Sequence, residues 1–382
     1  MKFCVVGIDA SRNRSGGAKS HLVGLLEAGD PAEFGIGKVH VWAYHSLLDA
    51  LPKVPWLVKH HPSALERSLL RQLWWQRFEL PAEIRGQGCD ILLSTDAGTI
   101  GTFEPSVVMS RDMLSYEPCE MRRYGISKAW MRLCGLRYIQ ARSLKRARGA
   151  IFLTRYAADT IQEFIGTLPN SVIIPHGISD AFRKNARVGR AAHEGATIRC
   201  VYVSNADLYK HQWHVARAVG ELRKRGHDVI LTLVGGGEGK AQRLIDAEVA
   251  LIDPHGKFVR SVGAVAHEKL PAVLAESDLF VFASSCENMP NTLLEGMAGG
   301  LPIACSNRGP MPEVLQDGGV YFDPENSDSI AAALERLVSD TELRARVAQR
   351  ARILSQQFSW TRCAKETWTF LRQNVSRWAE AQ

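Results

Sequence analysis

The segment 277–303, "SDLFVFASSCENMPNTLLEGMAGGLPI", joins a buried-strand pattern to a helical pattern through a short polar loop. "SDLFVFASS" is a continuous apolar run of the kind found in strands buried on both faces. "NTLLEGMAGG" has helical spacing, with Asn291 as its expected N-cap and Gly299 or Gly300 at its end. A strand, a loop and a helix in this order are the repeating unit of a parallel α/β sheet, so the segment predicts a doubly wound α/β fold.

Two blocks of the chain repeat this alternation of short apolar runs and longer helix-like segments. Between the blocks, residues 179–197 are polar and lack apolar periodicity, which predicts an interdomain linker. We therefore expect one Rossmann-like domain at 1–180, a second at 195–356, and a carboxyl-terminal helix at 357–382 that packs back on the first domain. The predicted strands lie in the runs 1–10, 38–45, 90–98, 105–112, 149–157, 170–178, 198–206, 228–237, 257–265, 277–285, 301–309 and 318–324.

The composition is that of a globular protein of 382 residues, with 46% hydrophobic and 23% charged residues. No apolar run is long enough to span a bilayer, and the amino terminus lacks a signal-peptide pattern, so we expect the protein in the cytoplasm. Eight cysteines without a C-x-x-C pair predict neither a zinc site nor a disulfide framework. The net charge of +7 indicates anionic partners, such as nucleic acid, phosphorylated small molecules or an acidic membrane surface.

The loop "CENMPN" carries the first of two glutamates, Glu287, and the following helix carries the second, Glu295. At the carboxyl edge of a parallel sheet, the backbone N–H groups of such a loop and of the helix start form a cradle for an anion. Two acceptors flanking this cradle suit a ligand with hydroxyl groups on both sides of a phosphate, as in a nucleotide sugar. The alternative is that Glu287 caps a backbone segment and Glu295 is a solvated helix residue.

The segment "ENMPNTLLEGMAGGLPI" resembles the E-x7-E signature of retaining glycosyltransferases of family four. In that family the signature is followed by Ala-Met-Ala-x-Gly-x-Pro and a Pro-Glu-Val/Ile element, to which "GMAGGLP" and "PMPEVLQDGG" are similar. The resemblance implies the GT-B fold, in which two Rossmann-like domains face each other across a cleft, the second one holding the nucleotide-sugar donor. Three further segments resemble the family: "IPHGI" at 174–178, "LTLVGGGEG" at 231–239 and "RSVGAVAHEKLPAVLAESDLFVFAS" at 260–284.

The family's donor-site roles transfer to matching positions of this signature. The resemblance implies that Glu295 accepts hydrogen bonds from the donor ribose hydroxyls and that Glu287 lies beside the transferred sugar and its reacting carbon. It further implies that the backbone between these two glutamates approaches the sugar hydroxyls and the diphosphate. The residues concerned are Asn288, Met289, Pro290, Asn291 and Thr292, the last also offering a hydroxyl donor.

The segment "VSNADLYKHQ" stands where the family normally has Gly-Arg, a short spacer and Lys-Gly. Lys210 matches the lysine that neutralises the donor diphosphate as the leaving group departs, a role that suits a compact ammonium group. Asn205 or Ser204 occupies the place of the arginine, and His211 replaces the glycine. Arg260 and Lys240 are candidates for the missing second charge. The alternative for Lys210 is a surface lysine at a helix start.

Glycines provide the remaining donor contacts that the resemblance implies. "RNRSGGAKSHLVGLL" resembles the family's glycine-rich loop after the first strand, so Gly16 and Gly17 would let backbone approach the donor phosphate or sugar when the cleft closes. Gly263 lies in the segment that is similar to the family's base-binding strand. We expect all three glycines to bind the donor.

Many relatives place a histidine of the catalytic region near a strand resembling "PSVVMSRD", where this chain has Arg111 and Asp112. Asp112 is a candidate base for the acceptor hydroxyl, because burial of a carboxylate in a cleft raises its pKa. It could equally cap the next segment. His176, in "IPHG", is interpreted as a hinge or packing residue rather than a catalyst.

No Asp-x-Asp occurs in the sequence, so the carboxylate pair that holds a divalent metal in the other major glycosyltransferase fold is absent. The charge of the leaving group would then be met by Lys210, backbone amides and a helix dipole. We expect no metal and no cofactor, with the nucleoside-diphosphate sugar as a co-substrate.

A basic segment, 122–148, contains nine Lys or Arg and no Asp or Glu. Together with "LERSLLRQLWWQRFELP" it interleaves cationic and aromatic residues on the first domain. Two interpretations are open: solvated helix faces whose tryptophans complete the core, or a face that docks on an anionic leaflet and brings the site to a lipid-linked acceptor. No nucleic-acid-binding module accompanies the charge, so we expect no nucleic-acid partner.

The sequence predicts a retaining, metal-independent glycosyltransferase that moves a sugar from a nucleoside-diphosphate donor to a hydroxyl acceptor. In the family the acceptor is often a lipid-linked glycan of surface polysaccharide or lipopolysaccharide assembly, which places the protein in the cytoplasm or on the inner face of the cell membrane. Two alternatives remain: a GT-B nucleotide-sugar epimerase or hydrolase, and a non-catalytic nucleotide-sugar-binding partner subunit.

Overall fold

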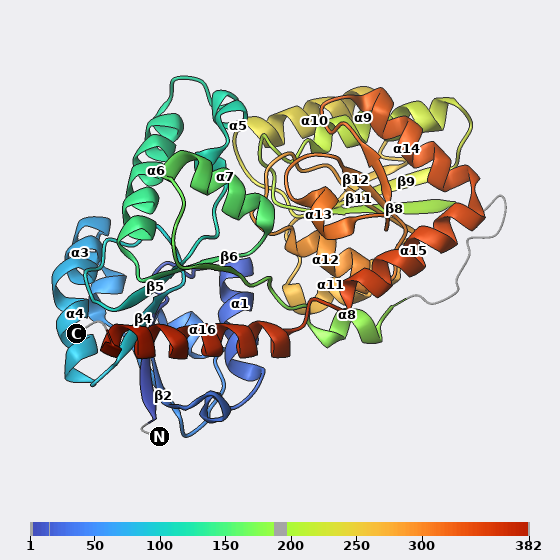
Figure 1. The fold of residues 1–382 in the computed structure, drawn as a ribbon. Helices are drawn as coiled ribbons and strands as arrows, with labels where there is room; N and C mark the ends of the chain where they lie inside the picture. The colour runs from blue at the N-terminus through green and yellow to red at the C-terminus, as the bar shows by residue number, and fades with distance from the viewer. Residues whose placement is uncertain (1–2, 15, 187–196, 381–382) are drawn as a thin grey trace. The chain divides into compact units, whose positions relative to one another are not determined.

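The computed structural model describes residues 3–14, 16–186 and 197–380, which form two compact units, each with its own parallel sheet (Figure 1). Unit 1 consists of Met1–Met121, Gly125–Gly177 and Phe358–Gln382, over its described residues. Unit 2 consists of Arg122–Tyr124 and Ile178–Gln357, again over its described residues. The architecture is therefore the α/β fold with two parallel sheets that the apolar runs predict.

The sheet of unit 1 has seven strands in the order β3-β2-β1-β4-β5-β6-β7, all paired in parallel. The sequence pattern predicted six of them and missed β3, because an edge strand with the polar residues Lys59 and His60 gives no continuous apolar run. The strands are β1 (Cys4–Asp9), β2 (Ile36–Trp42), β3 (Leu57–His60), β4 (Ile91–Ser94), β5 (Ser106–Met109), β6 (Gly149–Phe152) and β7 (Ser171–Ile173).

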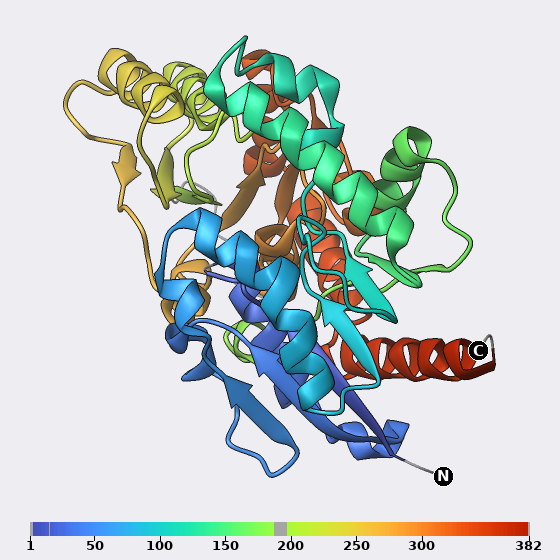
Figure 2. The ribbon, with the colours of Figure 1, turned by 90° about the vertical axis from the view of Figure 1, so that its left-hand side faces the viewer.

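Helices cover both faces of this sheet. Crossovers between parallel strands are right-handed, so connections that advance toward β3 and those that advance toward β7 place their helices on opposite faces. Figure 2 shows α3, α4 and α6 together in front of the sheet. The helical segments are α1 (Gly17–Glu27), η1 (Pro31–Phe34), α2 (His45–Leu48), η2 (Ser63–Glu66), α3 (Leu69–Trp74), η3 (Trp75–Glu79), α4 (Leu80–Gly86), η4 (Leu114–Tyr116), α5 (Pro118–Arg122), α6 (Lys128–Arg146), α7 (Arg155–Ile165) and α16 (Trp360–Glu380).

The last helix, α16, belongs to unit 1 although it is remote from that unit in sequence. Its first residue, Trp360, packs so closely on two glycines that a Cβ on Gly24 would lie 2.3 Å from the indole ring and one on Gly177 would lie 2.2 Å from the Trp360 backbone nitrogen. Trp368, further along the helix, is fully buried. These aromatic contacts anchor the carboxyl-terminal helix on α1.

The sheet of unit 2 has six parallel strands in the order β10-β9-β8-β11-β12-β13, each of which falls in a predicted apolar run. The strands are β8 (Ile198–Val203), β9 (Val229–Val234), β10 (Val259–Ser261), β11 (Leu279–Phe282), β12 (Ile303–Ser306) and β13 (Val320–Phe322). The helical segments are α8 (Asp180–Lys184), α9 (Gln212–Lys224), α10 (Lys240–Ile252), η5 (His267–Lys269), α11 (Leu270–Ala275), α12 (Asn291–Ala298), α13 (Met311–Leu315), α14 (Ser327–Ser339) and α15 (Thr341–Ser355).

Helix α8 corrects part of the linker prediction for 179–197. The polar segment begins with a helical turn because Ser179 accepts a hydrogen bond from the Ala181 backbone N–H and so caps it. Phe182 is buried, and Arg183 donates to the hydroxyl of Ser355 at 3.1 Å, which fixes α8 on unit 2. Residues 187–196 of the predicted linker lie outside the described residues.

Across the described ranges, no helix combines the length and the apolar character needed to cross a bilayer.

Candidate functional site

Two loops at the carboxyl edge of the unit 2 sheet bring Lys210 and Glu287 together. The strands that precede these loops, β8 and β11, are neighbours in the sheet. The Lys210 ammonium forms an ion pair with Oε1 of Glu287, and the two side chains are only 10% and 16% exposed. Lys210 is therefore not a solvated surface lysine, and Glu287 is the partner of its charge.

The backbone around Lys210 is fixed by groups from the neighbouring strands. The Tyr202 hydroxyl, on β8, donates to the Lys210 carbonyl at 2.6 Å, and the Ser285 backbone N–H donates to the Tyr209 carbonyl at 2.8 Å. The Lys210 ammonium also lies 4.9 Å from the centre of the Tyr209 ring. The lysine is thus held in place before any ligand binds.

His211 precedes α9 and has a left-handed backbone with φ of 52°. This conformation favours glycine, the residue that the resemblance implies at this position. The His211 ring lies 2.9 Å from the Ser285 hydroxyl through Nε2. Burial lowers the pKa of His211 to about 3, so the imidazole is neutral at physiological pH and adds no charge to the site.

Helix α12 begins at Asn291, with Pro290 in the capping position, so the prediction that Asn291 is the N-cap is wrong by one residue. The Leu294 N–H donates to the Pro290 carbonyl at 3.1 Å, which makes Asn291 the first helical residue. The helix ends where Gly300 adopts a φ of +68°. It lies against β11, because a Cβ on Gly296 would come within 2.9 Å of the Phe280 ring.

Glu295 projects from α12 toward His267, which the sequence analysis did not identify. Oε1 of Glu295 lies 2.7 Å from Nε2 of His267. The Glu295 carboxylate raises the pKa of His267 above its ordinary value. The Phe182 ring packs edge-on against His267 at 5.6 Å. A histidine 28 positions before Glu295, on a different loop, gives no signal in sequence spacing.

Glycines let three strand-ending loops of unit 2 approach one another. Gly235, with φ of 108°, donates its N–H to the Gly263 carbonyl at 2.7 Å. A Cβ on Gly235 would lie 2.1 Å from the Ser204 carbonyl oxygen, so no larger residue fits. Gly263 has a φ of 68° and open space around it. Asn205 is exposed, and its carbonyl accepts from Gln212 at 2.9 Å.

The two candidate substitutes for the missing arginine are both exposed residues of unit 2. Arg260 lies in the edge strand β10, and Lys240 is the first residue of α10. Each stands beside one of the glycine loops described above, since Gly239 caps α10 and Gly263 follows β10.

The other predicted site residues belong to unit 1. Gly16 caps α1 with a φ of 60° and open space around it, and Gly17 is the first residue of that helix. Asp112 accepts hydrogen bonds from the Leu114 N–H at 3.2 Å and from Gln140 at 3.3 Å. Burial raises the pKa of Asp112, but these bonds support the capping interpretation.

A buried polar network at the carboxyl edge of the unit 1 sheet was also missed by the sequence analysis. Asp9, at the end of β1, accepts from Gln76 at 2.7 Å and from the Ser11 hydroxyl at 2.6 Å. Asn13 accepts from the Thr95 hydroxyl at 3.0 Å and from Arg111 at 3.3 Å. The run "GIDASRN" gave the signal, since polar residues there directly follow a buried strand.

His176 is buried in unit 1, where its ring stacks on that of His21 with 4.5 Å between centroids. The Trp360 ring lies 6.0 Å away. These contacts are those of a packing residue, as interpreted from the sequence.

Among the residues that the structure describes, no cluster of three or more His, Cys, Asp or Glu side chains could hold a metal ion.

Comparisons with known proteins point to one class of enzyme. Residues 189–354 match the family model described as "Glycosyl transferases group 1". The O-antigen chain mannosyltransferase B of Escherichia coli is 34% identical over 110 residues, 29% of this chain and 29% of the relative. A GDP-mannose-dependent alpha-(1-6)-phosphatidylinositol monomannoside mannosyltransferase of Mycolicibacterium smegmatis is 31% identical over 208 residues, 50% of this chain and 52% of the relative. The chain thus spans about a third to a half of these relatives.

The fold has close counterparts among solved structures. A sucrose-phosphate synthase from Thermosynechococcus elongatus superposes with a TM-score of 0.78 over 98% of this chain and 100% of that one, at 17% sequence identity. At this identity the likeness concerns the fold alone. This protein, with its two parallel-sheet units, has the GT-B fold of glycosyltransferases.

Proposed function

We propose that this protein is a retaining glycosyltransferase that transfers mannose from a nucleoside diphosphate to a hydroxyl group of a glycan acceptor. The observation that carries the proposal is the Lys210–Glu287 ion pair, which lies at adjacent strand ends within the segment that matches the group 1 model. A fixed cation can stabilise the negative charge that grows on a departing diphosphate, and a fixed carboxylate beside it can stabilise the positive charge that develops on the sugar carbon.

In the proposed reaction, the Lys210 ammonium faces the donor diphosphate and neutralises the negative charge that grows on the leaving group. Glu287 lies at the sugar and stabilises the positive charge that develops on the reacting carbon. Because the two side chains are already paired and little exposed, neither must be desolvated or reoriented when the donor binds.

Glu295 is proposed to accept hydrogen bonds from the ribose hydroxyls, with His267 holding one of its oxygens. The backbone from Asn288 to Thr292 is proposed to cradle the diphosphate at the start of α12. Gly263 and Asn205 stand on the adjoining loops, where exposed backbone could approach the nucleotide. With Lys210 and these amides present, we propose that the reaction requires no metal.

Mannose is the proposed sugar because both relatives described above are mannosyltransferases, and the second is named as GDP-mannose-dependent. The first relative builds an O-antigen chain and the second acts on a phosphatidylinositol mannoside, as their names state. Both names support a surface-glycan setting and the notion that the acceptor is lipid-linked.

A lipid-linked acceptor fits an exposed basic helix in unit 1. Helix α6 carries exposed Lys128, Arg132, Arg142, Lys145 and Arg146, and no acidic residue. We propose that α6 docks on the anionic leaflet of a membrane, where each basic residue near the surface contributes about 1 kcal/mol.

The donor assignment can be tested by measuring the thermal unfolding of the full chain with GDP-mannose, UDP-glucose and ADP-glucose. GDP-mannose should raise the melting temperature most, and Glu295→Ala should abolish most of that rise. No stabilisation by any nucleotide sugar would contradict the proposal and favour a partner subunit.

Transfer itself is tested with GDP-mannose labelled in the sugar and an acceptor extract from a bacterium. The label should appear in the glycan with the anomeric configuration of the donor. Free labelled mannose, or an epimerised nucleotide sugar, in place of labelled glycan would identify the protein as a hydrolase or an epimerase. Chelation of divalent metals should leave the rate unchanged.

A further inference from the structure

A cavity of about 400 Å³ is lined by residues of unit 1, whereas Lys210 and Glu287 belong to unit 2. It exists because the connection from β4 to β5, residues 95–105, is a loop without a helix. The right-handed rule would place a helix of this connection on the same sheet face as α4 and α6. Without a helix there, the cavity lies between η3 and α6, with residues of the loop 99–104 along it.

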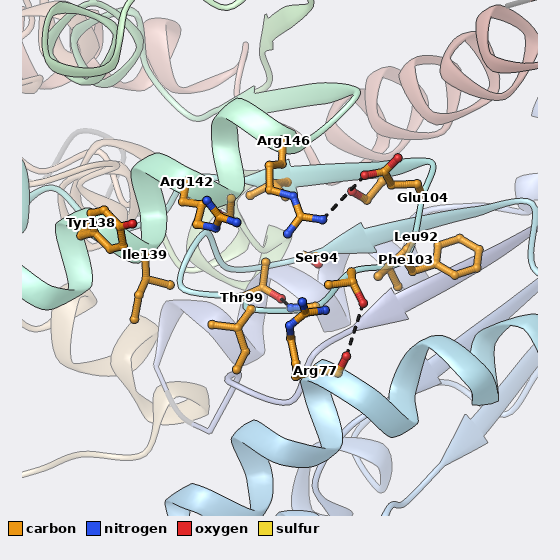
Figure 3. A pocket seen from close by; sticks show the side chains of 16 residues that line it. Arg77, Leu92, Ser94, Thr99, Phe103, Glu104, Tyr138, Ile139, Arg142 and Arg146 are labelled. Atoms are coloured by element: carbon orange, nitrogen blue, oxygen red, sulfur yellow. Dashed lines mark hydrogen bonds and ion pairs between the residues drawn. The ribbon is translucent and has the colours of Figure 1, made fainter.

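The cavity has a floor of two apolar and two hydroxyl-bearing residues and a cationic rim (Figure 3). Alternate residues of β4 and β5 form the floor, which brings Leu92 and Ser94 next to Ser106 and Val108. Phe103 closes one side. Three arginines line the rim, against a single glutamate, and they come from elements on opposite sides of the cavity: Arg77 from η3, and Arg142 and Arg146 from α6.

The backbone places Arg77 at the rim through a π-helical turn. The helical run from α3 to α4 contains the wide turn η3, in which the Leu80 N–H donates to the Trp75 carbonyl. Pro81 has no N–H and cannot bond the Arg77 carbonyl four residues earlier. The Thr102 hydroxyl, from the helix-free loop, donates to that carbonyl instead at 3.3 Å. Such turns occur frequently at functional sites.

The rim arginines carry charge that the protein does not neutralise. Within the described part of the chain, Arg77 and Arg142 form no ion pair with a carboxylate. Arg146 has only a long contact of 3.8 Å to Glu104, and both of these side chains are exposed. The Ser94 hydroxyl on the floor has no hydrogen-bond partner in the described residues. The cavity therefore offers an anion several charge-assisted hydrogen bonds.

An exposed apolar patch adjoins the rim at Arg77. Leu69, Leu70, Trp74 and Phe78, on α3 and η3, are each more than half exposed. The Trp74 and Phe78 rings lie 4.5 Å apart, and the Arg77 guanidinium lies 5.5 Å from the Phe78 ring centre. A ligand whose anionic group enters the cavity would thus have an apolar surface beside it for a hydrocarbon chain.

We propose that this cavity binds the phosphate group of a lipid phosphate, with the guanidinium groups of Arg77 and Arg142 on the phosphate oxygens and the hydrocarbon chain along the Trp74–Phe78 patch. Arginine suits this role because its planar group binds phosphate through two parallel N–H donors. The role of that lipid as the carrier to which the glycan acceptor is linked rests on the proposed function, whereas its binding to unit 1 does not.

The test is calorimetric titration of the full chain with farnesyl phosphate, farnesol and inorganic phosphate. Farnesyl phosphate should bind at least tenfold more tightly than either fragment. The double variant Arg77→Gln/Arg142→Gln should weaken its binding by tenfold or more. The matched control, Lys38→Gln/Lys53→Gln, removes the same charge from exposed residues of unit 1 outside the cavity and outside α6, and should change the affinity less than threefold.

Three results would overturn the site. If farnesol bound as tightly as farnesyl phosphate, only the apolar patch would be recognised. If inorganic phosphate bound as tightly as farnesyl phosphate, the hydrocarbon part of the lipid would contribute nothing. If the two double variants lost the same affinity for farnesyl phosphate, the effect would come from the overall charge of the protein and not from the cavity. Stabilisation by GDP-mannose should be unaffected in both variants, so a failure of the donor assignment and a failure of this cavity are read separately.

Discussion

The connection from β11 to β12 in unit 2 contains a helix, whereas the corresponding connection from β4 to β5 in unit 1 contains none. This difference decides what each region can bind. In unit 2, β11 and β12 are joined through α12, whose start supplies backbone amides and whose second turn carries Glu295. In unit 1, β4 and β5 occupy the corresponding places beside the first strand of their sheet, but their connection contains no helix in residues 95–105. The filled connection forms a site of fixed polar groups, and the unfilled one leaves a cavity.

The two regions also differ in whether their cations are paired with a carboxylate. The charge of Lys210 is matched by Glu287 at low exposure, so its position is set before a ligand arrives. The guanidinium groups of Arg77 and Arg142 are exposed and have no ion-pair partner among the described residues. A preorganised pair suits stabilisation of a short-lived charge, whereas solvated cations suit recognition of a stable anion.

The largest effect is expected from Lys210→Met, which removes the cation from the unit 2 site. It leaves the Glu287 carboxylate little exposed and unpaired, which costs about 3 to 5 kcal/mol in comparable buried pairs. The value of kcat/KM for the nucleotide sugar should fall by about 10² to 10³ because the leaving group loses its counter-charge. Sugar transfer and thermal unfolding measure the two effects.

The control for Lys210→Met is Lys224→Met. Lys224 pairs with Glu221 at 2.8 Å on the exposed surface of α9, where a salt bridge contributes about 0 to 1 kcal/mol. Activity should stay at the wild-type level in this control. If both variants lost the same activity, the Lys210–Glu287 pair would not be the centre of the site.

Gly→Ala substitutions in the two regions compare how closely their loops are packed, and they should have smaller effects than Lys210→Met. In unit 2, Gly235→Ala forces a Cβ to 2.1 Å from the Ser204 carbonyl at a φ of 108°, so it should destabilise the fold by about 2 to 4 kcal/mol. In the helix-free loop of unit 1, Gly101→Ala meets Thr99 Oγ1 at 3.3 Å and should cost less than about 1 kcal/mol. Denaturant unfolding curves would measure both, and similar losses would contradict the difference in packing.

The sequence predicted the filled side far better than the unfilled one. Continuous apolar runs identified both β8 and β11, and the family resemblance singled out Lys210 and Glu287 in the loops that follow them. The structure adds that β8 and β11 are neighbours, so that both residues lie at one sheet edge. The ion pair itself depends on side-chain reach, which a single sequence does not encode. The edge strand β3 was missed because half-exposed strands carry polar residues that break the apolar run.

The cavity could not be predicted from the sequence because it results from a missing element. A loop at 95–105 is visible in the pattern, but which sheet face it leaves open follows only from strand order and crossover handedness. The wide turn that presents Arg77 depends on Pro81 and on the Thr102 hydroxyl, two residues that lie 21 positions apart in sequence. His267 was missed for a similar reason, since its partner Glu295 comes from another crossover.

Thr102→Val tests whether the helix-free loop holds Arg77 in place at the rim of the cavity. The substitution keeps the side-chain shape and removes the hydroxyl that bonds the Arg77 carbonyl, which Pro81 leaves without a helical donor. We expect a loss of about 0.5 to 1.5 kcal/mol in unfolding free energy and a loss of about threefold in farnesyl phosphate affinity. An unchanged affinity together with the expected loss of stability would show that the turn does not position Arg77.

The smallest effect is expected from the pH dependence of the His267–Glu295 pair on the filled side. Glu295 raises the pKa of His267, so the stabilisation by this pair is complete below the ordinary histidine pKa and is lost as the pH rises through the raised value. Because the His267 side chain is 45% exposed, solvent screening limits the contribution to a few tenths of a kcal/mol. The melting temperature of His267→Gln should therefore lie slightly below that of the wild type at pH 6 and equal it at pH 9. A difference that grows with pH would reverse the sign and exclude the charged pair, and NMR titration of the His267 ring would then locate its pKa directly.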